Sequence, residues 1–313
     1  MANTRAEAFA PATVANLGVG FDILGLALHE PGDVVRAERR EDPGAVIVHI
    51  EGDGGRLPYA ADKNTACIAA EATLRLLGVR TGAALTIYKR LPLASGLGSS
   101  AASAVAAAVA VNALYGASLT CAELLPACLE GEAAVSGYHA DNIAPCLFGG
   151  ITLVTGTTAD QIHALPVPAN IVLGLFTPDM AVPTAMARAV LPALVGLREM
   201  VAQTAAVAWL VDALHRQDIA ELAAAMEGDV VVETARAHLI PHLEDARAAA
   251  KQAGALGVVI SGAGPTLCAV CDDETTARAA GEAMQAIYAR VGITGMARHT
   301  RISTKGAHVL GVA

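Results

Sequence analysis

The segment PLASGLGSSAAS at residues 92–103 constrains this 313-residue chain more than any other feature. An alternating run, ALTIYKR, precedes it and is typical of a strand, and the alanine-rich run that follows is typical of a helix. Gly96 and Gly98 lack side chains, so backbone N–H groups can come close to an anion there. Ser99 and Ser100 are expected to cap the helix, whose start favours anions. Strand, glycine turn and helix in this order predict a phosphate-binding loop.

Three alternatives compete with that interpretation. A Walker A loop requires G-x-x-x-x-G-K-[ST], and no lysine follows these glycines. Gly96, Gly98 and Ala101 match the G-x-G-x-x-G/A fingerprint of dinucleotide-binding domains. That fold needs an apolar strand ending in an acid about twenty residues further on, and YGASLTCAELL is not such a strand. A tight turn that only caps a helix is the third alternative.

Charge and apolar content exclude several classes of protein. The 21 Lys and Arg against 30 Asp and Glu give a formal net charge of −9, so no nucleic-acid partner is expected. Hydrophobic residues make up 54% of the chain, which excludes disorder as the main state. The uncharged stretch at residues 91–122 is interrupted by Pro92 and rich in alanine, and it predicts a buried helix and no membrane partner. The N-terminus lacks the pattern of a secretory signal, which predicts a cytoplasmic protein.

Strand and helix patterns along the chain predict an α+β protein. The first half shows strand runs and helices, the first helix ending at Gly78, and the pattern starts afresh after Thr158. We therefore expect two domains, residues 1–160 and 161–313, each a sheet with helices packed on it. The C-x-x-C pair in LCAVCD lies in a strand pattern, so its two thiols are expected to be buried on opposite faces.

Three segments resemble the GHMP kinases, a family that includes galactokinase and mevalonate kinase. They are APATVANLGVGFDILGLAL at residues 10–28, the phosphate segment at residues 92–103 and SGAGPT at residues 261–266, in the family's order over nearly the whole chain. The resemblance implies a GHMP kinase-like two-domain fold, with a ferredoxin-like sandwich as the second domain. It also implies ATP as co-substrate, Mg²⁺ as metal and an approach of the third segment to the phosphate loop.

Four stretches are similar in particular to those members of the family that phosphorylate L-homoserine. They are NLGVGFDILGLAL, HADNIAP at residues 139–145, PTAMARAVLP at residues 183–192 and RAHLIP at residues 236–241. The implied reaction converts ATP and L-homoserine into ADP and O-phospho-L-homoserine, a step of threonine biosynthesis. The high apolar content is also compatible with a buried interface, so we expect a homodimer.

The resemblance assigns roles residue by residue. The expected ATP contacts are Pro92, Leu93, Ala94, Ser95, Gly96, Leu97, Gly98, Ser99, Ser100, Ala101, Ala102, Asn64, Lys89 and Thr184. The expected substrate contacts are Asn16, Asp22, His139, Asn142, Arg188 and Arg236. Guanidinium groups suit the carboxylate of a small zwitterion, and Asp22 suits its ammonium group. Ser100 and Glu132 are the expected magnesium ligands.

Several of these assignments have alternatives. Glu130 is the second candidate for the metal, because the spacing from Glu132 to the histidine loop is shorter than in relatives. Glu233 stands where relatives tend to carry proline, which could alter the loop that presents the second arginine. Lys89 is either a nucleotide contact or an edge charge that prevents strand aggregation. Asp141 is either a general base or a group that orients the acceptor hydroxyl.

Two other functions stay open at this stage. A GHMP kinase that acts on another alcohol would keep the phosphate loop and change the acceptor site. A non-catalytic relative that senses a ligand would have lost loop or metal residues, yet Ser99, Ser100, Glu132 and Asp141 are all present.

Overall fold

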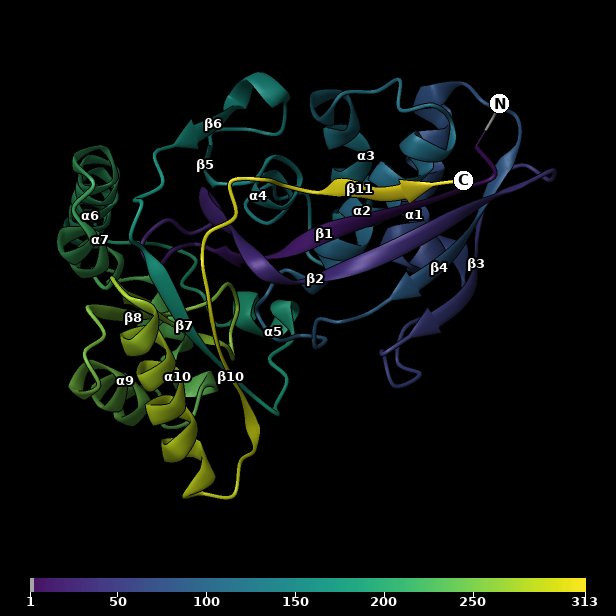
Figure 1. Ribbon diagram of the computed structural model, residues 1–313. Helices are drawn as coiled ribbons and strands as arrows, with labels where there is room; N and C mark the ends of the chain where they lie inside the picture. Colours follow the sequence, from purple (N-terminus) through teal and green to yellow (C-terminus); the bar gives the residue numbers. More distant parts are fainter. Residues whose placement is uncertain (1–2) are drawn as a thin grey trace.

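The computed structural model describes residues 3–313, and within this range the chain forms two β-sheets covered by helices (Figure 1). The first sheet consists of β1 (Arg5–Ala15), β2 (Leu24–Arg40), β3 (Ala45–Glu51), β4 (Gly82–Tyr88), β5 (Ile151–Val154), β6 (Ile162–Leu165) and β11 (His308–Val312). Its order is β11-β1-β2-β4-β3, and β5 pairs with both β2 and β6. The described pairs are antiparallel except β3 with β4, which is parallel.

The helices of the first sheet explain the high alanine content. They are α1 (Thr65–Leu77), α2 (Ser99–Leu114), α3 (Cys121–Ala133) and α4 (Ile143–Phe148), with the short 3₁₀ turns η1 (Ala61–Lys63) and η2 (Ala159–Gln161). Helix α2 lies against β1 and β2 and also contacts α1, α3 and α4. Every residue of α2 except Ser100 is buried. A helix covered on all sides needs small apolar side chains all round, which is why its sequence shows no apolar stripe.

This arrangement confirms the prediction of a buried helix in the long uncharged stretch. In residues 3–313, no helix combines the length and the apolar character that crossing a membrane requires.

The second sheet consists of β7 (Val172–Pro178), β8 (Gly257–Ile260), β9 (Leu267–Cys271) and β10 (Gly295–Thr300). Its strands are antiparallel in the order β10-β7-β9-β8. The helices of this half are α5 (Thr184–Ala189), α6 (Leu197–Arg216), α7 (Ile219–Met226), α8 (Val232–Arg236), α9 (Leu243–Gln252) and α10 (Glu274–Ala289), with the 3₁₀ turn η3 (Ala237–Leu239). A strand, helices, two strands, a helix and a strand follow each other, which is the ferredoxin-like order of elements.

Helices cover both faces of the second sheet. Phe176 faces α9 and α10 and belongs to a separate apolar cluster with Met284. Leu175 faces the other way and joins the main core together with Leu210 of α6. Cys268 and Cys271 follow the same alternation, one in each cluster, and both are free thiols, as the sequence predicted.

The expected boundary at residue 160 needs one correction. β6 pairs with β5 in the first sheet, and the C-terminal strand β11 returns to pair with β1. Figure 1 shows the yellow β11 beside the purple β1, away from the second sheet. Residues 161–313 therefore do not form the second domain alone. The sequence did not predict β6, β11 or α4, because elements of four to six residues carry too little periodicity.

Candidate active site

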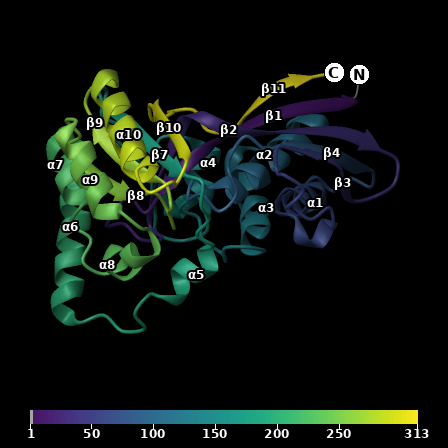
Figure 2. The ribbon, with the colours of Figure 1, turned by 90° about the horizontal axis from the view of Figure 1, so that it is seen from below.

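A cavity of about 380 Å³ lies between the two halves of the molecule. Its size suits a small-molecule site. The short helix α5 forms part of the wall and lies between α8 and α3 in Figure 2. The cavity brings together expected residues from both halves, namely Asn16, Asp22, Asn64, Lys89, Leu93, Ala94, Ser95, Gly96, Gly98, Ser99, Ser100, Glu132, His139, Asp141, Asn142, Thr184, Arg188 and Arg236.

Four of the expected nucleotide contacts lie elsewhere. Leu97, Ala101 and Ala102 are buried in the main hydrophobic core, and Pro92 is exposed outside the cavity wall. Ala101 and Ala102 belong to the first turn of α2, whose side chains pack on the sheet and the neighbouring helices. The phosphate motif thus mixes residues that face the cavity with residues that anchor the loop.

The glycines of the phosphate loop are required by its backbone and its neighbours. Gly96 has φ +82° and Gly98 has φ +63°, conformations that other residues rarely adopt. A Cβ atom on Gly98 would lie 2.0 Å from Thr13 Oγ1, and one on Gly96 would lie 2.3 Å from the Ser261 carbonyl oxygen. Any side chain at either position would therefore displace a neighbouring element.

The start of α2 differs from the sequence expectation. Gly98, and not a serine, is the N-cap residue, and no side chain caps the helix. The Ser99 hydroxyl instead accepts a hydrogen bond from Lys89 Nζ at 2.8 Å. The first amides of a helix lack partners inside the helix. Without a side-chain cap they remain available to an anion in the cavity.

The second glycine turn, residues 261–266, packs against the phosphate loop, as the family resemblance implied. The Ser261 hydroxyl donates to the Gly96 carbonyl at 2.7 Å, and the Thr266 amide donates to the Ser95 carbonyl at 3.1 Å. The Gly262 amide donates to the carbonyl of Ala15 at 3.2 Å. The loop is therefore held between both halves of the molecule.

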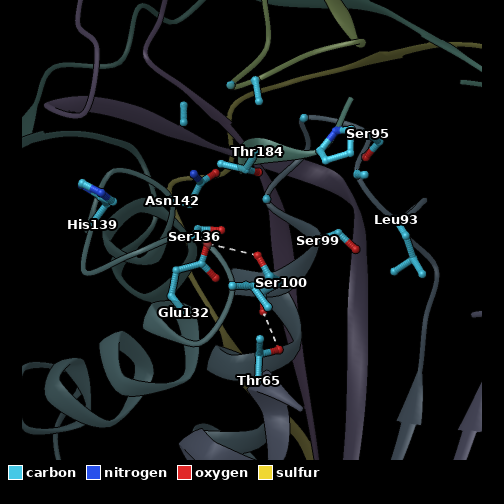
Figure 3. Close-up of a pocket in the computed structure, with 18 of the residues that line it drawn as sticks. Thr65, Leu93, Ser95, Ser99, Ser100, Glu132, Ser136, His139, Asn142 and Thr184 are labelled. Carbon is cyan, nitrogen blue, oxygen red and sulfur yellow. Dashed lines mark hydrogen bonds between the residues drawn. The ribbon is translucent and has the colours of Figure 1, made fainter. Parts of the chain in front are cut away.

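Glu132 and Ser100 form a pair beside the loop, on the facing sides of α3 and α2 (Figure 3). The Ser100 hydroxyl donates to Glu132 Oε1 at 3.0 Å. Glu132 Oε2 is buried and has no hydrogen-bond partner among the residues that the structure describes. Burial raises the pKa of Glu132, and the hydroxyls of Ser100 and Ser136 oppose this effect. An unpaired carboxylate oxygen next to a hydroxyl fits a hard divalent cation, which prefers oxygen ligands.

The alternative metal ligand, Glu130, lies on a different face of α3. Its exposed carboxylate pairs with Arg75 of α1, and it does not line the cavity. Two residues that are two positions apart on an α-helix point to nearly opposite sides of it, so Glu130 and Glu132 cannot share a face.

Asp22 and Arg188 pair with each other across the two halves. Arg188 donates to both oxygens of Asp22, at 2.7 and 3.0 Å, and His139 Nδ1 lies 3.5 Å from Asp22 Oδ2. Asp22 has φ +61°, and its amide donates to the Asn16 side chain at 3.2 Å. The sequence predicts that these two groups bind opposite ends of a substrate, and in the structure they form an ion pair with each other.

Phe21, which the sequence analysis missed, connects the two arginines. Its ring centroid lies 5.3 Å from Cζ of Arg188 and 4.9 Å from Cζ of Arg236. Arg236 is buried and donates to the carbonyl oxygens of Ala187 and Gly262. Burial and the nearby Arg188 lower the pKa of Arg236. Two neighbouring guanidinium groups offer several N–H donors in fork geometry, which suits the carboxylate of a ligand.

Asp141 lies at the wall between the metal pair and the arginines. Its side chain is buried, and burial, Asp22 and Glu132 together raise its pKa to about 7. A carboxyl group with a pKa near neutral pH can exchange a proton with a bound hydroxyl. The neighbouring Asn142 accepts a hydrogen bond from Thr13 at 2.6 Å, which ties the start of α4 to β1.

Asn64 and Lys89 are engaged within the protein. Asn64 caps α1 through the amide of Ala66 and donates to the carbonyl of Pro58. The side chain of Lys89 is 1% exposed and pairs with Asp33. The interpretation of Lys89 as an edge charge is wrong, because β4 lies between β2 and β3 and the ammonium group points inward.

Further wall residues were not predicted as contacts, although several of them lie inside the quoted segments. They are Ala15, Phe21, Leu57, Pro58, Lys63, Thr65, Ser103, Val135, Ser136, Val182, Pro183, Ala185, Gly262 and Ala263. Most lie within three residues of a predicted contact, so adjacency to a motif is the signal that could have found them. In Figure 3, Thr65 and Ser136 lie beside Ser100 and Glu132.

A loop for phosphate groups thus meets a charged pocket in one cavity between two domains, which is the arrangement of a small-molecule phosphotransferase. Residues 64–150 match the family description "GHMP kinases N terminal domain", and residues 210–290 match "GHMP kinases C terminal".

The homoserine kinase of Arabidopsis thaliana is 44% identical over 313 residues, which cover 97% of this chain and 84% of that protein. The homoserine kinase of Halorubrum lacusprofundi is 42% identical over 303 residues, covering 96% of this chain and 98% of that protein. A crystal structure of homoserine kinase from Cytophaga hutchinsonii superposes with a TM-score of 0.94 at 40% identity and covers 99% of this chain and 98% of that one. The chain belongs to the GHMP kinases, and within them to the homoserine kinases.

Proposed function

We propose that the protein transfers the γ-phosphoryl group of ATP to the side-chain hydroxyl of L-homoserine, giving ADP and O-phospho-L-homoserine, a step of threonine biosynthesis. ATP as co-substrate follows from the kinase family. The observation that carries the acceptor is the pair Asp22–Arg188, with Arg236 behind it, in the same cavity as the phosphate loop. A free amino acid carries an ammonium group that suits Asp22 and a carboxylate that suits the two arginines.

Acceptor binding is an exchange of ion pairs. The ammonium group of L-homoserine forms an ion pair with the Asp22 carboxylate, while the carboxylate of L-homoserine is bound by Arg188 and Arg236. Both guanidinium groups are fixed in advance, Arg236 by the carbonyls of Ala187 and Gly262 and both by the ring of Phe21. Substrate charges that replace the internal partner keep every buried charge compensated. A neutral sugar carries no charge that could take the place of either partner in the Asp22–Arg188 pair, which argues against galactose.

Mg²⁺ fits the pair formed by Ser100 and Glu132, whose free oxygen Oε2 is buried without a partner among the described residues. When bound, the cation supplies positive charge that neutralises the transferred phosphoryl group. The amides at the start of α2 and of the phosphate loop stabilise the same oxygens. Phosphoryl transfer asks a protein mainly for alignment and charge neutralisation, and these groups supply both.

Asp141 has one of two roles in this proposal. As a general base, its carboxylate takes the proton from the acceptor hydroxyl as the new P–O bond forms. As an orienting group, it accepts a hydrogen bond from that hydroxyl and fixes its direction. A pKa of about 7 lets the carboxylate exist at working pH and still accept a proton.

The proposal extends to the setting of the protein. We place it in the cytoplasm as a homodimer without a nucleic-acid partner, on the grounds of its composition and charge. Sedimentation at micromolar protein concentration checks the dimer.

Release of ADP with MgATP and a panel of L-homoserine, L-threonine, L-serine, mevalonate and galactose tests the reaction. Turnover with L-homoserine and little with the others is the expected result. Turnover with a different alcohol would retain the kinase and reject the acceptor. No release of ADP with any compound of the panel would favour a non-catalytic protein that senses a ligand.

A further inference from the structure

A buried ion pair lies directly beneath the phosphate loop, and the proposed reaction has no direct use for it. Asp33 of β2 and Lys89, which follows β4, have side chains that are 0% and 1% exposed. The two residues lie 56 positions apart in the chain and meet under the first turn of α2. Burying two charges is costly unless every hydrogen-bonding atom is satisfied. The contacts of this pair therefore show what it does.

The lysine holds the end of the loop. Lys89 Nζ donates to the Ser99 carbonyl at 2.8 Å, to the Ser99 hydroxyl at 2.8 Å and to the Ser103 hydroxyl at 2.9 Å, in addition to Asp33. An ammonium group has three protons. All of its N–H donors are thus already used within the protein. A direct hydrogen bond to a nucleotide would require Lys89 to lose one of these internal hydrogen bonds.

The aspartate holds the beginning of the loop. Asp33 Oδ1 accepts the backbone amides of Arg90 at 3.0 Å and Leu91 at 3.2 Å. Its other oxygen, Oδ2, accepts from Lys89 and from the Ser103 hydroxyl at 2.9 Å. The Asp33 carboxylate therefore binds the backbone just before the loop. It also binds Lys89, which in turn holds the helix that follows the loop.

We propose that Asp33 and Lys89 are positioning residues that fix the distance between the two ends of the phosphate loop, and that Lys89 does not bind the nucleotide directly. Between Leu91 and Ser99 the chain turns through Gly96 and Gly98, whose backbones are intrinsically flexible. With both ends held, the amides of the loop and of the α2 start keep the arrangement that an anion needs. The inference rests on the proposed function only in that the loop holds the phosphates of ATP.

Removal of the negative charge of Asp33 distinguishes a positioning role of the pair from direct binding of the nucleotide by Lys89. If Lys89 were a phosphate ligand, Asp33→Asn would free it and remove a negative charge near an anion, so nucleotide binding would stay equal or tighten. If the pair positions the loop, the same change breaks the loop's attachment and weakens binding. An asparagine presents one acceptor oxygen and one NH₂ group in place of two acceptor oxygens, so it cannot accept from both the amides and the lysine.

The experiment measures the dissociation constant of MgADP by titration calorimetry for the wild type, Asp33→Asn, Lys89→Met and Ser103→Ala. We expect at least a tenfold weakening in the first two variants and a two- to fourfold weakening in Ser103→Ala. The KM for L-homoserine should stay within about twofold, because the acceptor groups lie on other elements. Leu85→Ala is the matched control, since Leu85 is buried in β4 and does not line the cavity, and its MgADP affinity should equal that of the wild type.

The double variant Asp33→Asn/Lys89→Met keeps the test valid where a single change leaves a buried charge and prevents folding. It is neutral at the site, so it should fold and still bind MgADP at least tenfold more weakly. Wild-type affinity in the double variant, or equal or tighter binding in Asp33→Asn, would overturn the inference. Normal nucleotide binding by a wild type that does not phosphorylate L-homoserine would reject the proposed function alone. A wild type that does not bind MgADP would overturn both.

Discussion

Asp141 shows at the level of one residue how a buried carboxyl group in the cavity wall opposes stability. Its pKa is raised to about 7 from an ordinary value near 4, because burial and the charges of Asp22 and Glu132 disfavour the ionised form. Between these two values the folded chain binds more protons than the unfolded chain. The free energy of unfolding therefore decreases as pH rises through this window and is constant above it.

Asp141→Asn should remove this pH dependence. We expect the variant to be more stable than the wild type at pH 8, by at most about 4 kcal/mol, and equal to it near pH 4. Thermal unfolding of both proteins at pH 4.5, 6 and 8 checks this. The same variant should lose most of its kcat if Asp141 is the general base, and near-wild-type kcat would leave it only an orienting role. A stability gain that does not change with pH would show that the carboxyl titrates normally.

Phe21 should determine how tightly the acceptor carboxylate is held. Phe21→Leu removes the aromatic face that both guanidinium groups share, at a cost of roughly 1–2 kcal/mol. The KM for L-homoserine should rise about tenfold, while the KM for ATP stays the same. Turnover of 3-aminopropan-1-ol, which lacks the carboxylate, should be unaffected by the change. Phe176→Leu is the control, because Phe176 lies in the core of the second sheet. An equal loss with both acceptors would contradict this role.

Among the elements, α2 depends on small side chains along its whole length. It lies close to α3 at Gly131, where an added Cβ would lie 2.9 Å from the Ala104 Cβ. Ala104→Leu should force α2 away from α3 and cost about 1–3 kcal/mol, or more if the backbone cannot shift. We expect a Tm lower by several degrees and a weaker affinity for MgADP, because α2 begins at the phosphate loop. Ala286→Leu on the exposed face of α10 should leave the Tm nearly unchanged.

The elements also show what a sequence can and cannot reveal. The phosphate loop was predictable because glycines, serines and flanking periodicity act within twelve residues. The role of Glu132 as a metal ligand stays a prediction from its family context, and the structure shows only that it contacts Ser100 while Glu130 pairs with Arg75. The partners of Lys89 were not predictable, because Asp33 lies 56 residues away and no local pattern links the two. The same holds for Phe21, whose role depends on arginines from α5 and α8.

At the scale of the whole molecule, the C-terminal segment closes the first domain. β11 covers the outer edge of β1, with Ala6 opposite Val312 and Phe9 opposite His308. The segment before it packs on α4 so closely that a Cβ on Gly306 would lie 2.3 Å from the Leu147 carbonyl oxygen. After β10 the chain thus leaves the second sheet and returns to the first, where β11 pairs with β1. The two domains are therefore linked by two crossings of the chain.

Deletion of residues 305–313 should therefore affect the first domain and not the second. Without β11, the N–H and C=O groups on the outer edge of β1 lose their partners, and an unprotected edge can pair with another chain. We expect a lower Tm, faster proteolysis within residues 3–165 and concentration-dependent association in size-exclusion chromatography. Gly306→Val should reproduce the loss of stability with a full-length chain. If the deleted protein kept the stability and the elution volume of the wild type, β11 would be dispensable and the division of the chain near residue 160 would describe its folding units after all.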